Sequence, residues 1–159
     1  MLAVKQGSVA DVESVWPLWA SMVEHHRAVA GEDWPVRTAE AAWAIRREQY
    51  VGWLADGSGT LLLATTDARL VGYAMLQIQP SGATWDLGPS IGELESLAVL
   101  PEARGQGVGH RLMGECRKLL RERGIDHWTV GVVEANEDAV RLYLREGFKP
   151  YYRQLLGRV

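Results

Sequence analysis

The chain has 159 residues, of which 47% are hydrophobic and 23% charged, with a net charge of −3 and one cysteine. This length and composition predict a single globular domain over residues 1–159. They exclude an intrachain disulfide and give no support for a nucleic-acid partner, which would favour a basic face. No apolar run approaches the roughly 20 residues of a membrane span, and no signal-peptide pattern opens the chain. We therefore expect a cytoplasmic protein without a membrane partner.

Hydrophobic spacing and turn residues predict six strands and four helices in the order β-α-α-β-β-β-α-β-α-β. Asp11 is expected to cap the first helix, which Pro17 should kink or delay, and Thr38 to cap the second. The predicted elements in chain order are a strand over 2–6, a helix from about 11, a helix over 39–55, a hairpin of strands over 61–66 and 70–78, a strand over 91–100, a helix over 107–123, a strand over 127–133, a helix over 136–145 and a strand over 148–156. This order predicts a mixed α/β domain around one sheet.

The most informative segment lies between the predicted strand over 91–100 and the helix that follows it. The strand ends before Pro101, and Arg104 opens a turn with glycines at 105, 107 and 109. Glycines let the backbone approach a ligand closely, and the first amides of a helix have no internal partner. The segment therefore predicts a site for an anionic group such as a pyrophosphate.

Two common phosphate-binding motifs do not fit this turn. The dinucleotide fingerprint needs a third glycine where this chain has His110 or Leu112. The Walker loop needs Gly-Lys-Ser/Thr where residues 114–116 read Gly-Glu-Cys. What remains is Arg104-x-x-Gly107-x-Gly109.

This pattern resembles the acyl-CoA-binding motif of the GCN5-related N-acetyltransferase (GNAT) superfamily. Residues 136–148 carry a second pattern that resembles the family's other signature, Asn136-x-x-Ala139-x-x-Leu142-Tyr143-x-x-x-Gly147-Phe148. The resemblance implies a mixed α/β (α+β) sheet of six to seven strands, splayed between the fourth and fifth and flanked by four helices. Few residues follow Phe148, so a seventh strand would be short, absent or supplied by a partner subunit, which is compatible with a homodimer.

The resemblance also implies acetyl-CoA as cosubstrate and assigns residues to its parts. The backbone of Leu97, Ala98 and Val99 should pair with the pantetheine arm, and the pantetheine and thioester should lie near Asn136, Ala139 and Tyr143. Tyr143 would protonate the departing thiolate, although a tyrosine at this position also fits a simple core role. The pyrophosphate should bind to the turn formed by Arg104, Gly105, Gln106, Gly107, Val108 and Gly109.

An alkyl ammonium has a pKa of about 10.4, so the acceptor amine must lose a proton before it attacks. Glu93 and Glu95 alternate on the fourth strand and should share one face, whereas Ser96 should lie on the other. We favour Glu95 as the base because it lies nearer the pantetheine segment. Glu93 and a water chain stay open as alternatives. The histidines and the single cysteine show no metal-ligand spacing, so no metal is expected.

Together these features predict an acetyl-CoA-dependent N-acetyltransferase that acts on a primary amine by direct attack in a ternary complex. A small-molecule acceptor is slightly favoured over a protein lysine or N-terminus, and a non-catalytic acyl-CoA-binding module is a further alternative. Acidic and aromatic residues near the expected acceptor site favour a cationic amine. These residues are Trp16, Trp19, Glu24, His25, His26, Glu32, Asp33, Trp34, Trp85 and Asp86.

Overall fold

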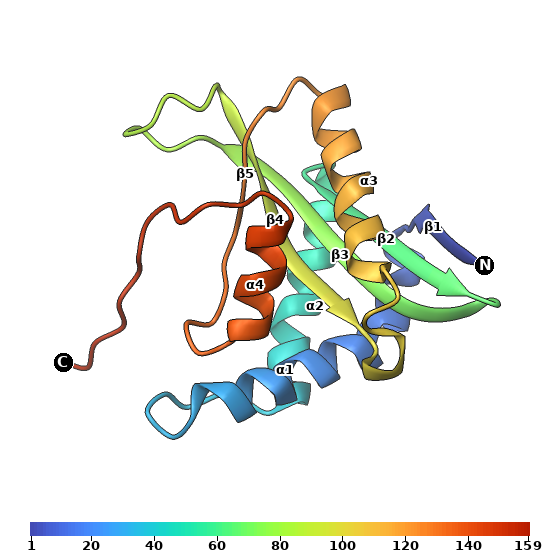
Figure 1. The fold of residues 1–159 in the computed structure, drawn as a ribbon, viewed down its shortest axis with the longest axis horizontal. Coiled ribbons are helices and arrows are strands. Elements are labelled where there is room, and N and C mark those ends of the chain that lie inside the picture. Colours follow the sequence, from blue (N-terminus) through green and yellow to red (C-terminus); the bar gives the residue numbers. More distant parts are fainter.

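The computed structural model describes residues Met1–Val159 and contains five strands and four α-helices (Figure 1). A 3-10 helix (Val9–Val15) precedes α1, and a short 3-10 turn (Pro101–Ala103) follows β4. The elements are β1 (Leu2–Gln6), α1 (Trp16–Ala30), α2 (Ala39–Asp56), β2 (Gly59–Thr66), β3 (Arg69–Pro80), β4 (Ser90–Val99), α3 (Val108–Glu122), β5 (Trp128–Val130) and α4 (Glu137–Arg145).

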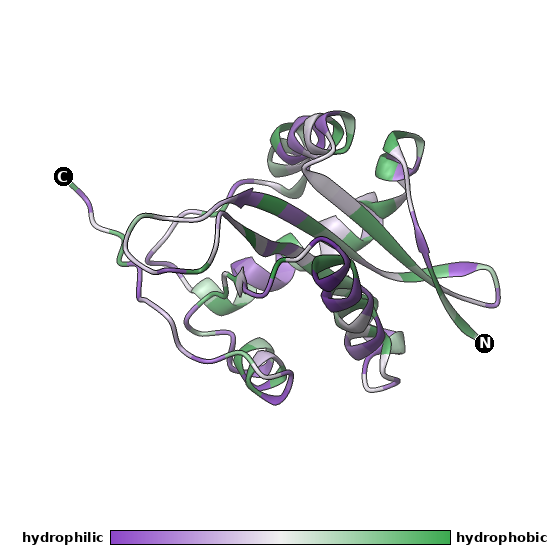
Figure 2. Ribbon diagram, turned by 90° about the horizontal axis from the view of Figure 1, so that it is seen from above, coloured by the Kyte–Doolittle hydropathy of each residue, from purple (hydrophilic) through white to green (hydrophobic).

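The five strands form one sheet in the order β1-β2-β3-β4-β5. Neighbouring strands are antiparallel except β4 and β5, which are parallel. Helices lie on both sides of this sheet (Figure 2). One buried cluster joins α1 and α2 to the first face, and another joins α3 to the second face. The α/β class, the splayed sheet and the four helices agree with the predicted fold.

The sheet has five strands rather than the predicted six to seven, and β5 has three residues where seven were expected. Residues 148–156 form no strand. Pro150 cannot donate to a strand ladder, and a three-residue β5 offers little edge for pairing. Instead, side chains of this C-terminal segment contact loops: the Tyr151 ring lies 4.8 Å from that of Trp85, and Arg158 Nη2 donates to the Asp33 carbonyl at 2.7 Å.

The N-terminal helix begins differently from the prediction. Ser8, not Asp11, is the N-cap, and the Asp11 carboxylate accepts a hydrogen bond of 2.8 Å from the Ser8 amide. A 3-10 helix follows, and α1 itself starts at Trp16 with Pro17 in its first turn, where a missing amide proton costs nothing. The expected delay by Pro17 is therefore confirmed. Thr38 caps α2 as predicted, accepting from the Ala41 amide at 3.2 Å.

A β-bulge in β4 changes which side chains share a face. Met75 of β3 pairs with Ser96, and the next residue, Leu76, pairs with Leu94, so Glu95 is an extra residue without a partner. Beyond the bulge Ser96 faces α2, where the Tyr50 hydroxyl donates to its Oγ at 2.6 Å. The expectation that Ser96 lies on the opposite face of the strand from the glutamates is wrong, because Glu95 and Ser96 both contact α2. The bulge shifts the period-two alternation by one residue.

Candidate active site

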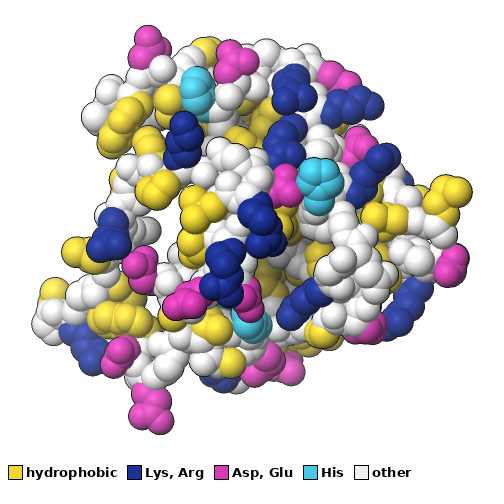
Figure 3. Space-filling view, in the orientation of Figure 1, with side chains coloured by type: hydrophobic (Ala, Val, Ile, Leu, Met, Phe, Trp, Pro, Cys, Tyr) yellow, Lys and Arg dark blue, Asp and Glu magenta, His cyan; other side chains and the backbone are white.

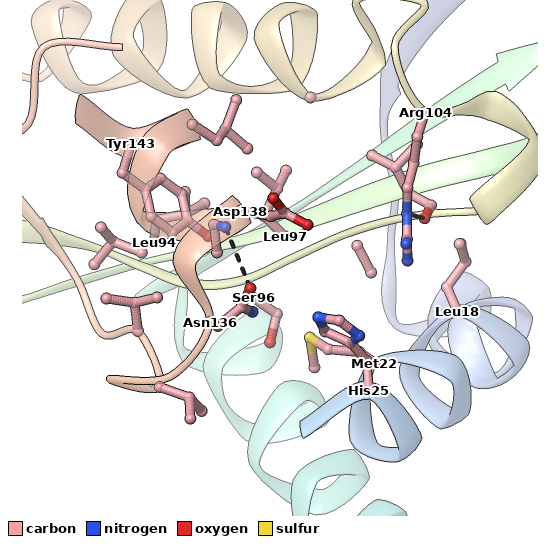
Figure 4. A pocket seen from close by; sticks show the side chains of 18 of the residues that line it. Leu18, Met22, His25, Leu94, Ser96, Leu97, Arg104, Asn136, Asp138 and Tyr143 are labelled. Atoms are coloured by element: carbon pink, nitrogen blue, oxygen red, sulfur yellow. Dashed lines mark hydrogen bonds between the residues drawn. The ribbon is translucent and has the colours of Figure 1, made fainter. Parts of the chain in front are cut away.

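A cleft of about 1010 Å³ opens where β4 and β5 separate. The two strands pair only as far as Leu94 with Val130, and from there to Val99 β4 is paired with β3 alone. The cleft lies between this free part of β4, residues 130–133, the N-terminal end of α3 and one side of α4 along its length, with α1 on a further side (Figure 4). On the face shown in Figure 3, acidic and basic side chains lie beside one another around the hollowed centre.

The free edge of β4 is formed by the segment expected to bind pantetheine. Leu97, Ala98 and Val99 pair with β3 on one side only, and all three line the cleft. The Arg104 Nε donates to the Val99 carbonyl at 3.2 Å, so this guanidinium lies against the end of the strand (Figure 4). An extended ligand can therefore add to β4 where β5 has diverged.

The glycine-rich turn ends in the N-terminus of α3. Gly105 and Gly107 have φ of +73° and +80°, a left-handed backbone that favours glycine. Gly107 is the N-cap and offers no side chain, so the first amides of α3 are uncapped. Every predicted residue of this turn lines the cleft except Gln106, whose Nε2 instead donates to the Glu102 carbonyl at 2.9 Å.

Gly107→Ala is expected to weaken acetyl-CoA binding about tenfold, the equivalent of one charge-assisted hydrogen bond. The methyl group strains a left-handed residue. It would also stand in the open space before the first amides of α3, where the pyrophosphate is expected to bind. Gly114→Ala is the matched control, because Gly114 lies within α3 and has open space around it. Isothermal titration calorimetry should give an unchanged Kd for the control. Equal affinities in the two variants would remove the turn from the phosphate site.

Tyr143 lies on α4 with its ring in the cleft (Figure 4). Burial raises the pKa of its hydroxyl to about 12, and the ring packs edge-on against Phe148 with centroids 5.7 Å apart. Asn136 also lines the cleft, and its Oδ1 accepts from the Ala139 amide at 3.2 Å. Asn136 is thus the N-cap of α4, and Tyr143 is a protonated phenol throughout the neutral range.

Glu146 fixes the end of α4 against α3. Arg117 Nη2 donates to its Oε2 at 2.6 Å and to its carbonyl at 2.7 Å, while His110 Nδ1 lies 2.7 Å from Oε1. Burial opposes ionisation, yet the hydrogen bonds from Arg117 and His110 hold the pKa of Glu146 below its ordinary value. This cluster holds the helix that carries Tyr143.

Both candidate bases line the cleft from β4. Glu95 Oε1 lies 2.5 Å from Arg46 Nη1 of α2. Burial raises the pKa of the Glu95 carboxyl, the nearby Glu93 adds to this, and Arg46 opposes it. Glu93 accepts a 3.0 Å hydrogen bond from Gln79 Nε2. Glu95 therefore combines a raised pKa with an ordered position, as a general base requires.

Only Trp19, His25 and His26 of the ten residues expected near the acceptor line this cleft. Burial and the charge of His25 lower the pKa of His26, which favours a neutral imidazole. The other expected residues lie elsewhere: Trp16 packs on Trp43 with centroids 6.0 Å apart, and Trp34 lies under the Arg158 guanidinium. Glu24, Glu32, Asp33, Trp85 and Asp86 are also absent from the cleft wall.

Several residues of the cleft carry no local signal in the sequence. Arg46 and Ser96 reach it through tertiary packing and the bulge, and His110 reaches it from the first turn of α3. Among the described residues, no three or more His, Cys, Asp or Glu side chains are grouped so that they could hold a metal ion. None of the helices combines the length and the apolar character needed to cross a membrane.

The sequence profile of the acetyltransferase (GNAT) family matches residues 19–148. The chain is 32% identical over 148 residues to the aminoalkylphosphonate N-acetyltransferase of Salmonella typhimurium, covering 92% of this chain and 84% of that relative. It is 29% identical over 118 residues to the mycothiol acetyltransferase of Saccharomonospora viridis, covering 74% of this chain but only 38% of that relative.

Among solved structures, an aminoglycoside N-acetyltransferase in complex with CoA has the same fold, with a TM-score of 0.76 at 18% identity. The alignment covers 100% of this chain and 95% of that one. The splayed β4 and β5, the glycine turn before α3 and the match over residues 19–148 agree with one another. The chain belongs to the acetyltransferase (GNAT) family.

Proposed function

We propose that this protein transfers an acetyl group from acetyl-CoA to the primary amine of a small molecule. The observation that carries this proposal is the unpaired edge of β4 over 97–99, which leads directly into the uncapped N-terminus of α3. An extended amide-bearing arm fits the strand edge, and a pyrophosphate fits the amides of the turn. The solved relative that holds CoA supports this use of the fold.

In the proposed reaction Glu95 takes a proton from the acceptor ammonium, through water where the two are not in contact. The neutral amine then attacks the thioester carbonyl in the ternary complex, so that a C–N bond forms and the C–S bond breaks. The nitrogen releases its second proton to solvent as the amide forms, while Tyr143 gives its phenolic proton to the departing thiolate and regains one from solvent. Glu95 likewise returns its proton to solvent. A free thiol has a pKa near 8.5 and the Tyr143 phenol one of about 12, so this transfer is uphill by itself and is driven by the favourable conversion of the thioester into an amide.

A small-molecule acceptor is supported by the relatives, because one acts on aminoalkylphosphonates and another on aminoglycosides. The acceptor end of the cleft adds support for an amine with an apolar part, because Leu18, Trp19 and Met22 of α1 line it beside the glutamates. An ammonium group would lie near Glu93 and Glu95, and the remaining body against these apolar side chains.

Two measurements test the proposal. Calorimetry should show binding of acetyl-CoA and CoA to the purified protein, and a thiol-detecting reagent should report CoA release with members of a panel of small amines. Binding without release for any amine would favour a non-catalytic module. Release only with peptides that carry a lysine or a free N-terminus would overturn the small-molecule acceptor.

Glu95→Gln is expected to lower kcat/KM at neutral pH by about 100-fold and to remove the acidic limb of its pH profile. That limb should lie above the ordinary carboxyl range, because burial raises the pKa of Glu95. Glu93→Gln is the comparison variant, because Glu93 is the alternative base two residues away on the same strand. A loss confined to the Glu93 variant would move the base to Glu93, and a limb retained in both variants would favour a water chain.

A further inference from the structure

Arg46 of α2 is the cation that faces the reacting end of the cleft, and aromatic rings hold it in place. Its guanidinium carbon lies 5.6 Å from the ring centroid of Trp19 and 5.8 Å from that of Trp53. The side chain is 27% exposed, and its partner Glu95 is 15% exposed. A planar guanidinium between two indoles loses little further freedom when it pairs with a carboxylate.

Glu95 needs such a partner because of where the bulge puts it. It is the extra residue of β4, so no neighbour on β3 fixes its backbone position. A bulge directs a side chain away from the regular alternation, and a mostly buried carboxylate without a cation tends to become protonated. The 2.5 Å contact with Arg46 supplies both an anchor and a compensating charge.

The other groups around Glu95 do not supply a positive charge. Glu93 on the same strand adds negative charge, and the hydroxyls of Tyr50 and Tyr73 behind it are buried and neutral, since burial raises the pKa of each. His25 and His26 line the cleft from α1, and the pKa of His26 is lowered. Arg46 is therefore the fixed cation that Glu95 meets.

We propose that Arg46 is a positioning residue that holds the carboxylate of Glu95 at the acceptor site and stabilises its charged form. This inference rests on the proposed function, in which Glu95 accepts the proton of the amine. It predicts that the guanidinium acts through Glu95 and not by contact with acetyl-CoA.

The test compares Arg46→Gln, Arg46→Lys and Arg47→Gln. Arg47 is the neighbouring residue on α2, ion-paired with Glu13 at the surface, and serves as the matched control. The first readout is the ¹³C NMR titration of the Glu95 carboxyl in the protein alone, assigned by its loss in Glu95→Gln. The second is the pH profile of kcat/KM with an amine found in the acceptor panel.

In Arg46→Gln we expect the Glu95 titration and the acidic limb to move together to higher pH by about one unit or more. Arg46→Lys keeps a positive charge and should reverse part of this shift. Arg47→Gln should match the wild type. An unmoved Glu95 titration in Arg46→Gln would overturn the inference, whereas a moved titration with an unmoved limb would contradict Glu95 as the base of the proposed reaction. Should Arg46→Gln fail to fold, Arg46→Met replaces it, and an unmoved Glu95 titration in that variant would overturn the inference.

These outcomes are distinguishable from failure of the proposed function. A wild-type protein that acetylates no amine would contradict the proposed function, while the NMR titration would still decide whether Arg46 holds the charge of Glu95. An active wild type with an unmoved titration would contradict the role of Arg46 alone.

Discussion

Tyr143→Phe is expected to lower kcat by about 100-fold, the lower end of what general acid catalysis contributes, while the Kd for acetyl-CoA stays within a factor of two or so. Phenylalanine keeps the ring that packs on Phe148 and removes only the hydroxyl. The departing thiolate then has no proton donor from the protein, so a transition-state interaction is lost and ground-state binding is kept. Stopped-flow turnover and calorimetry measure the two quantities separately.

The pH profile of kcat in Tyr143→Phe provides a second test. Burial raises the pKa of Tyr143 to about 12, so the phenol stays protonated below pH 10 and adds no limb to the neutral profile. The variant should therefore show a uniformly lower profile of unchanged shape in that range. Tyr152→Phe is the control, because Tyr152 lies in the C-terminal segment, outside the cleft lining. A kcat equal to the wild type would leave Tyr143 with a packing role only.

Features that depend on short stretches of sequence could be predicted well. The hydrophobic spacing that predicted a helix over 107–123 agrees with the burial of Leu112, Met113, Cys116 and Leu120 on α3. The turn between β2 and β3 was also expected. The positive φ angles at Gly105 and Gly107 follow from the same glycines that suggested an anion site. Local geometry and local side-chain pattern agree in each case, so no distant contact was needed to predict them.

Features that depend on distant contacts could not be predicted. The bulge at Glu95 arises from pairing with β3, and no glycine or proline marks it. Arg46 lies 49 positions before Glu95 and meets it only because α2 packs across the sheet face. The predicted C-terminal strand is absent for a related reason. Residues 148–156 have strand-forming side chains, but the three-residue β5 is too short for another strand to pair with.

These observations explain why the cleft lies where the sheet divides. The pairing of β4 with β5 ends at Leu94, and the bulge at Glu95 follows immediately. The carboxylate therefore reaches the cleft at the point where the backbone edge becomes free for a ligand. The proposed base and the proposed cosubstrate edge, which begins at Leu97, therefore lie two residues apart on one strand.

Leu112→Ala is expected to lower the free energy of unfolding by about 3 kcal/mol, within the roughly 2–5 kcal/mol range for buried leucines. Leu112 is fully buried at the centre of the cluster that joins α3 to the sheet, and its Cδ1 lies over Gly72 of β3. Urea unfolding followed by circular dichroism measures the change. Leu144→Ala is the control, because Leu144 on α4 is 49% exposed and should cost far less.

Repeating both unfolding curves with acetyl-CoA separates packing from binding. A ligand at 100 times its Kd stabilises the folded state by about 2.7 kcal/mol. The Leu144 variant should gain this full increment, because its substitution leaves α3 unchanged. Leu112 anchors the helix whose first amides form the proposed pyrophosphate site, so its variant should gain less than the control at the same ligand concentration. An equal gain in both variants would show that α3 keeps its place over the glycine turn without Leu112.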